Sequence, residues 1–258
     1  MIKKTSIIKL KSLFKSLGLK KNDTVFVHSS LFSLGIIDKG IDGFHSALKE
    51  VIGVYGTIIV PTFTYSFRRN EKFDIQNTPS AKTIGLYSEY IRKKNSVRSS
   101  DPLFSMAAIG PMANKLMKRN SFNCFGEHSI YEKLFDQDVK FLCIGISYSS
   151  GLSAFMHIEK KAKVPYRKDL MLSGISIGSK GEQYKDYVIH FARDEKNFFD
   201  GAKIDREEMG LYLEKNKISK SLNYRYGKHF LISAKQFEQS VLEKLEENPL
   251  FMYKQNHK

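Results

Sequence analysis

Residues 153–167, SAFMHIEKKAKVPYR, combine an imidazole, a carboxylate and a guanidinium within a short stretch. His157 precedes Glu159 by two positions, and Arg167 follows a Pro-Tyr corner. Histidine is the most common proton acceptor near neutral pH, and a nearby carboxylate can orient its ring. Arg167 could clamp a phosphate or carboxylate of a substrate. We interpret His157 as a candidate base and Glu159 as its partner; the alternative for His157 is a polar residue at a helix edge.

Further candidates stand where three apolar runs end in polar side chains. Ligands bind beyond the carboxyl ends of parallel strands, so these side chains predict one binding rim. Serine and threonine are also common in loops, which is the alternative interpretation. The residues concerned are His28, Ser29 and Ser30 after TVFV, Thr62 and Tyr65 after GTIIVP, and Ser147 after VKFLCIGI.

Two loop positions carry acidic groups that could handle a proton or bind an amine. Asp101 precedes Pro102, where it could pair with a substrate ammonium, orient a base, or simply form a turn. Glu127 and His128 follow Gly126 and form a reserve acid–base pair at the substrate, unless they are solvated loop residues. The remaining histidines show no metal-ligand spacing, so we expect no metal.

The elements that must position these residues alternate between helical and strand patterns. Alternation of helices with continuous apolar strands predicts an α/β protein, a layered α/β/α fold with a largely parallel central sheet. We expect strands 24–28, 57–62 and 140–146 to be neighbours, and residues 1–258 to form a single domain. Helices are expected at 5–17, 42–53, 81–94 and 233–248, and a further strand at 184–193.

The net charge of +15 is the unusual feature of the composition. A basic protein favours anionic partners such as phosphorylated small molecules, although a lysine-rich composition alone would give the same charge. No block of like charges or nucleic-acid motif occurs, so a nucleic-acid partner is not expected. No apolar run is long enough for a membrane helix, and lysines interrupt the apolar N-terminal positions, so we expect neither membrane association nor a signal peptide. Cys124 and Cys143 lack a CxxC spacing, which favours free thiols in the cytoplasm.

Six motifs in order resemble the aminoglycoside 3-N-acetyltransferase family, also called antibiotic N-acetyltransferases. The resemblance covers about residues 5 to 235, and no single motif carries it. The motifs are VFVHSSLFSLG, GTIIVPTFTYSF, FDIQNTPSAKTIGLYSEYIR, RSSDPLFSMAAIGPMA, FGEHSIYEKLFDQDVKFLCIGI and EKKAKVPYR.

The resemblance implies acyl transfer from acetyl-CoA to an amino group of an amino sugar, without a metal. The family's His-Ser/Thr-Ser loop lies against the coenzyme, and here His28, Ser29 and Ser30 match it. By position in the same motifs, Leu31 and Thr62 are also expected at the coenzyme. A homodimer is one possible assembly.

The sequence departs from the family pattern at two places. The family carries a His-x-x-Glu pair where this chain has His-x-Glu; aligned on VPYR, the family histidine falls on Met156. A thioether cannot accept a proton at neutral pH, so His157 would have to reach in from the next position. Many members carry His-Pro-x-His-Ser where this chain has Asp101 and lacks both histidines.

Two alternatives to an aminoglycoside acceptor follow from these departures and from the charge. Aminoglycosides are polycations, and a protein with a net charge of +15 would repel them at long range. A nucleotide-linked amino sugar, used in surface-polysaccharide biosynthesis, would suit this charge better. Met156 raises the other alternative, a catalytically impaired homologue that only binds coenzyme A.

Overall fold

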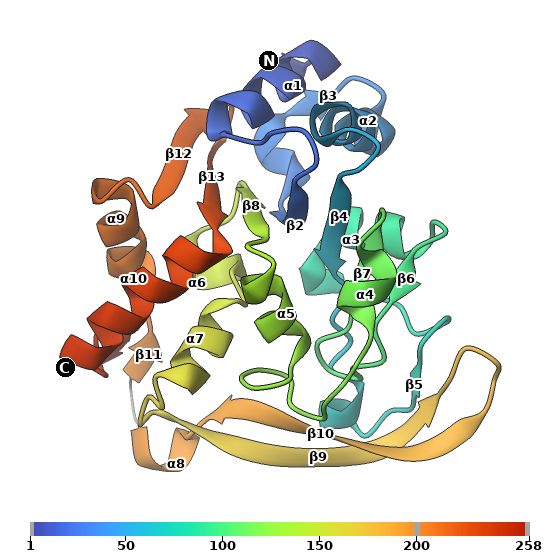
Figure 1. Cartoon of the computed structure of the whole chain (residues 1–258), viewed down its shortest axis with the longest axis vertical. Coiled ribbons are helices and arrows are strands. Elements are labelled where there is room, and N and C mark those ends of the chain that lie inside the picture. Colours follow the sequence, from blue (N-terminus) through green and yellow to red (C-terminus); the bar gives the residue numbers. More distant parts are fainter. Residues whose placement is uncertain (1–2, 199–201, 256–258) are drawn as a thin grey trace.

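The computed structural model describes residues 3–198 and 202–255 (Figure 1). Its central sheet has seven strands in the order β12-β13-β8-β2-β4-β7-β6. The bounds are β12 Ser219–Tyr224, β13 Gly227–Ser233, β8 Lys140–Ile144, β2 Thr24–Ser29, β4 Thr57–Pro61, β7 Met106–Ile109 and β6 Val97–Arg98.

Only the middle of this sheet is parallel. β2 runs parallel to β8 and to β4, so the expectation that these three strands are neighbours is confirmed. All four outer pairs are antiparallel, so the expected largely parallel sheet is wrong for the sheet as a whole. Helices cover both faces of the sheet, and a strand buried on both faces can be apolar throughout whether its neighbours are parallel or antiparallel, so apolar runs do not reveal strand direction.

Helices pack on both faces of the sheet and produce the expected α/β/α layering. The alternation along β2 shows the two faces: Val25 and Val27 join the apolar cluster on one side, whereas Phe26 joins the cluster on the other. The first cluster takes in α1 Ile7–Leu17, α2 Gly40–Ile52 and α3 Leu86–Arg92; the second takes in α4 Ala113–Met117, α5 Ile130–Asp136, α7 Phe155–Lys161 and α10 Ala234–Glu247.

Local sequence explains where the helices begin and end. Ser6 caps α1 by accepting a hydrogen bond from the Lys9 N–H, and Gly18 ends it in a left-handed conformation, so the expected helix 5–17 is confirmed. α2 begins earlier than expected, at Gly40, so Asp42 lies in its first turn and is not its N-cap. In the described ranges, none of the helices has the length and apolar character needed to span a membrane.

A long hairpin lies apart from the central sheet. It consists of β9 Arg167–Ile177 and β10 Gln183–Arg193, which includes the expected strand 184–193, and it pairs with β5 Phe73–Asp74. The hairpin crosses the bottom of Figure 1, opposite α1 and α2. The remaining elements are β1 Lys4–Thr5, β3 Ile36–Ile37, β11 Ala202–Ile204, β14 Tyr253–Gln255, α6 Tyr148–Gly151, α8 Glu195–Phe198, α9 Glu207–Lys215, η1 Leu31–Leu34, η2 Ser66–Arg69 and η3 Lys82–Ile84.

Candidate active site

A cavity of about 860 Å³ opens where the parallel strands β2, β4 and β8 end. Its walls come from segments far apart in the sequence: residues 28–32 at the end of β2, residues 82–86 at the start of α3, and residues 149–153 around α6. A cavity of this volume can hold a drug-sized ligand. The cavity lies at the strand ends where the sequence predicts a binding rim, although Thr62 and Ser147 are not part of its lining.

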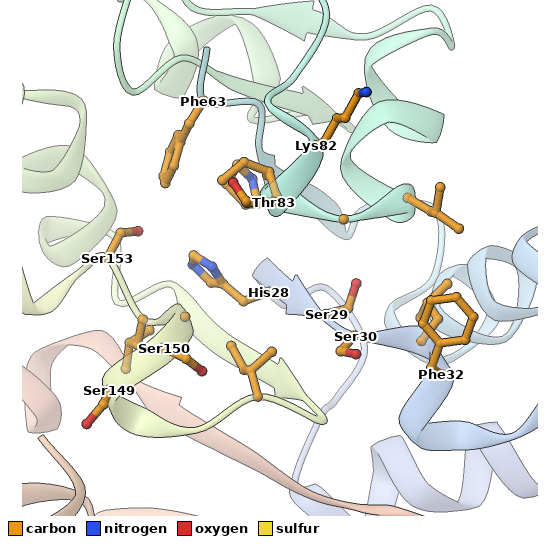
Figure 2. A pocket seen from close by; sticks show the side chains of 18 of the residues that line it. His28, Ser29, Ser30, Phe32, Phe63, Lys82, Thr83, Ser149, Ser150 and Ser153 are labelled. Carbon is orange, nitrogen blue, oxygen red and sulfur yellow. The ribbon is translucent and has the colours of Figure 1, made fainter. Parts of the chain in front are cut away.

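His28 lies at the centre of the cavity. Its ring is on the same face of β2 as Phe26, 4.5 Å away between ring centroids, and the residue is only 5% exposed. The Nε2 atom has no hydrogen-bond partner among the described residues. Burial lowers the pKa of His28 to about 3, so its imidazole is neutral at pH 7 and keeps a free lone pair or a free N–H. Figure 2 shows the ring between Ser29 and Ser30 on one side and Ser149, Ser150 and Ser153 on the other.

The first end of the cavity is formed by the turn after β2 and by the start of α2. Ser29, Ser30 and Leu31, which the resemblance places at the coenzyme, line it. The turn is fixed because the Ser33 hydroxyl donates to the Ser30 carbonyl over 2.7 Å. Gly40, the first residue of α2, also lines the cavity, which brings the positive end of a 13-residue helix dipole to this wall. This first end offers hydroxyls and a helix N-terminus to an anionic ligand.

The second end of the cavity carries hydroxyls on and beside α6. Ser149, Ser150 and Ser153 line it. Ser153 is buried, and its hydroxyl lies 2.5 Å from the Tyr131 hydroxyl, so its position is fixed. A hydroxyl held in this way can donate to an oxygen that becomes negatively charged during a reaction.

Aromatic rings form a third wall. The Phe104 ring lies 5.1 Å from the Phe63 ring and 5.8 Å from the Tyr65 ring, centroid to centroid. All three residues line the cavity, and a substrate-binding role for Tyr65 stays a prediction. Tyr65 has a φ of 57°, an uncommon conformation for a non-glycine residue, and burial raises the pKa of its hydroxyl. The wall gives a flat apolar surface on which part of a substrate can rest.

Met156, rather than His157, reaches this cavity. The two residues are neighbours on α7, and one helical position is a rotation of about 100°. His157 is fully buried outside the lining: its Nδ1 accepts from the Gly126 N–H over 3.2 Å, and its Nε2 lies 3.5 Å from Glu238. Burial lowers the pKa of His157, with Glu238 opposing the shift. Both ring nitrogens face other protein groups, so the position of His157 does not support the expected role as a base.

Glu159 and Arg167 belong to a buried ion cluster and do not meet His157. A Glu159 oxygen lies 2.7 Å from Arg167 Nε, and Arg206 Nη2 donates to both Glu159 oxygens over 3.0 Å. The Tyr166 hydroxyl donates to the same carboxylate over 3.3 Å. Arg167 lies outside the cavity lining, whereas Arg206 is part of it. Glu159 therefore holds an arginine at the cavity wall instead of orienting an imidazole.

Asp101, Thr62, Glu127 and His128 also lie outside the lining. The buried Asp101 carboxylate accepts from the N–H groups of Leu103 and Phe104, both over 2.8 Å, so it has the turn-forming role that was the alternative. Thr62 is fully buried and donates to Ser105 over 3.1 Å. Glu127 and His128 are exposed on the loop before α5. No group of three or more potential metal ligands occurs among the residues that the structure describes.

Several residues of the lining were not predicted as site residues, among them Ser153, Met156 and Arg206. Ser153, Met156 and Arg206 all contribute to the second end of the cavity. Met156 had a signal, the alignment on VPYR, whereas Ser153 looked like an ordinary loop serine. Arg206 binds Glu159, which lies 47 positions earlier in the sequence. The charged stretch IDREE around Arg206 looks like an exposed segment, so the sequence does not distinguish this arginine from a surface residue.

The family model described as aminoglycoside 3-N-acetyltransferase matches residues 26–246 of this chain. A similar curated protein is the SPbeta prophage-derived aminoglycoside N(3')-acetyltransferase-like protein YokD of Bacillus subtilis (strain 168), 30% identical over 67% of this chain and 71% of that protein. Aminoglycoside N(3)-acetyltransferase IV of Salmonella sp is 29% identical over 58% of this chain and 57% of that protein.

Solved structures share the fold over nearly the whole chain. AAC-IIIb, in a binary complex with CoASH, has a TM-score of 0.82 at 19% identity and covers 95% of this chain and 97% of its own. AAC-VIa with bound sisomicin has a TM-score of 0.82 at 22% identity and covers 95% of this chain and 99% of its own. With its sequence matched by the family model from residue 26 to 246, this chain belongs to the aminoglycoside 3-N-acetyltransferase family.

Proposed function

We propose that this chain is a coenzyme A-dependent N-acetyltransferase that moves the acetyl group of acetyl-CoA to an amino group of an amino sugar. One observation carries the proposal: the two ends of the cavity meet at the neutral imidazole of His28, whose Nε2 has no hydrogen-bond partner in the described ranges. Family membership supports it, and so do relatives whose structures hold CoASH or sisomicin.

The coenzyme fits the first end of the cavity. Ser29, Ser30 and Leu31 would contact the coenzyme, because the family loop that they match lies against it. The N-terminus of α2 at Gly40 offers free N–H groups and a positive dipole to its phosphates. The acceptor amine then enters from the second end, so that the thioester and the amine meet beside His28.

The chemical step forms a C–N bond and breaks a C–S bond. The amine nitrogen attacks the thioester carbonyl, and the Ser153 hydroxyl, held by Tyr131, donates to the carbonyl oxygen as it gains charge. His28 Nε2 takes a proton from the attacking nitrogen when the tetrahedral intermediate forms. The intermediate collapses with the sulfur leaving, and the same proton passes from His28 to the thiolate. The amide and free coenzyme A are the products.

A neutral His28 is suited to this step only if the amine arrives unprotonated. An imidazole with a pKa of about 3 cannot remove a proton from a free alkylammonium, which is several units less acidic. The proton that His28 receives comes from nitrogen after it has bonded to carbon, when the nitrogen is far more acidic. The apolar wall of Phe63 and Phe104 favours binding of the neutral amine.

We also propose that the protein works in the cytoplasm. Cys124 and Cys143 are both free and buried, which suits a reducing compartment.

Thiol release tests the proposed activity directly. Purified protein is incubated with acetyl-CoA and a panel of glucosamine, glucosamine 6-phosphate and sisomicin, and free thiol is followed with a thiol reagent. We expect release that depends on the amine, with at least one member of the panel. Release that is equal with and without amine would mean hydrolysis and would overturn the transferase proposal.

A further inference from the structure

The charge of the second cavity end identifies the kind of acceptor. Among the residues that the structure describes, the lining there consists of Ser149, Ser150, Ser153, apolar side chains and Arg206, with no carboxylate. Arg206 is 8% exposed, so it has been removed from water in the folded protein. Its Nε has no hydrogen-bond partner among the described residues, and its bonds to Glu159 use Nη2 alone. The guanidinium therefore keeps donors that the protein does not use.

The ion cluster behind Arg206 leaves a positive charge uncompensated. Glu159 is a single carboxylate shared between Arg167 and Arg206, at 2.7 and 3.0 Å, so the three groups together carry one net positive charge. Glu159 is fully buried, and the guanidinium of Arg206 also packs 4.9 Å from the Phe155 ring centre, which fixes its place. Charges that are screened little by water attract a counter-ion strongly.

Besides Glu159, two further acids lie beside this end of the cavity, and both bind Ser149. Asp205 accepts from the Ser149 hydroxyl over 3.2 Å, and Glu207 accepts from the Ser149 N–H over 2.8 Å. Neither is part of the cavity lining. Within the described part of the lining, a polycationic substrate would therefore meet a guanidinium and no carboxylate.

On the basis of the proposed function, we propose that Arg206 binds an anionic group on the acceptor. The acceptor is an amino sugar that carries a phosphate or a carboxylate, and polycationic aminoglycosides are poor substrates. An arginine can bind either anion with two parallel hydrogen bonds, so the two sources share one recognition chemistry.

The test compares acceptors that differ only in the anion. kcat/KM is measured with glucosamine, glucosamine 6-phosphate and 2-amino-2-deoxyglucuronate, and with sisomicin as the polycation. A charge-assisted hydrogen bond predicts about ten- to one-hundredfold preference for an anionic sugar over glucosamine. In Arg206→Gln this preference should fall to about threefold or less, and Arg206→Lys should keep part of it because the charge remains.

The matched control is Arg69→Gln, an exposed arginine outside the cavity that is paired with Glu71. This variant should keep the full preference. A higher kcat/KM for sisomicin than for both anionic sugars, or an unchanged preference in Arg206→Gln, would overturn the assignment while leaving the transferase activity standing.

A binding measurement keeps the assignment testable without turnover or if the Arg206 variants do not fold. With coenzyme A saturating the first end, inorganic phosphate should raise the Tm of the wild-type protein, because a ligand bound only to the native state stabilises it. Arg206→Gln, where it folds, should lose this effect and Arg69→Gln should keep it. No Tm increase in the wild-type protein would contradict an anion site at Arg206, whatever the thiol-release assay shows.

Discussion

Two buried histidines of this chain differ in what surrounds their ring nitrogens. His28 lines the cavity, whereas His157 lies outside the lining with its Nδ1 bonded to the Gly126 N–H and its Nε2 3.5 Å from Glu238. We expect His28→Gln to lower kcat by roughly 10²- to 10⁴-fold, the usual range for loss of a general base. His157→Gln should lower Tm but leave kcat within about threefold of wild type. Steady-state kinetics on both variants decides between the two histidines, and a large kcat loss confined to His157→Gln would favour His157 as the base.

The low pKa of His28 has a consequence for the pH–rate profile. Because burial holds that pKa at about 3, kcat/KM should show no limb from a histidine between pH 5 and 7. The fall at low pH should instead follow the pKa of the acceptor amine. The profile is measured with two amines of different pKa. If the fall in kcat/KM occurs at the same pH for both amines, the titrating group belongs to the enzyme, and the assignment of the fall to the acceptor amine is contradicted.

At the scale of elements, the turn after β2 depends on the turn after β8. A side chain at Gly145 would place its Cβ 2.0 Å from the Ser33 hydroxyl, the group that holds the Ser30 carbonyl. Gly145→Ala should therefore lower Tm and raise the KM for acetyl-CoA several-fold by moving this turn. Gly181→Ala is the control: it shares the positive φ, at 84° against 63°, but its Cβ would have no atom within 4 Å. Equal KM values for the two variants would contradict coenzyme binding at this turn.

The Glu159 cluster joins three elements, α7, β9 and the residue before α9. Glu159→Gln would leave Arg167 and Arg206 buried with no carboxylate between them. Breaking such a buried pair costs about 3–5 kcal/mol, so the free energy of unfolding should fall by that order. Urea unfolding monitored by circular dichroism measures it. A loss below about 1 kcal/mol would mean that water already reaches the cluster.

The sequence predicted elements better than it predicted side-chain directions. Apolar runs at 24–28, 57–62 and 140–146 were long enough to identify the three parallel strands, and with them the position of His28, Ser29 and Ser30. Whether residue 156 or 157 faces the cavity depends on the start of α7 at Phe155, and a shift of one residue rotates the side chain by about 100°. The pairing of Arg206 with Glu159 depends on tertiary packing across 47 positions, which local pattern does not encode.

At the scale of the whole molecule, several histidines are buried in the neutral state. Burial lowers the pKa of His28 to about 3 and that of His45 and His190 to about 4. In the unfolded chain these groups titrate near 6.5, so below that pH the unfolded state binds more protons and stability falls as pH falls. We expect the free energy of unfolding to decrease steadily from pH 7 to pH 4. Urea titrations at several pH values measure this decrease. His190→Gln should make the free energy of unfolding depend less steeply on pH. An unchanged pH dependence in this variant would contradict a contribution from His190.

The transfer of an acetyl group to nitrogen is tested most directly by following the carbonyl carbon itself. The protein is mixed with acetyl-CoA labelled with ¹³C at the carbonyl and with a pool of glucosamine, glucosamine 6-phosphate and sisomicin, and the label is observed by NMR. We predict that the thioester signal is replaced by an amide signal, with an equal amount of free coenzyme A, and that His28→Gln slows this change by at least about a hundredfold. A thioester signal that persists, or one that is replaced by acetate alone, would contradict N-acetyl transfer in this cavity.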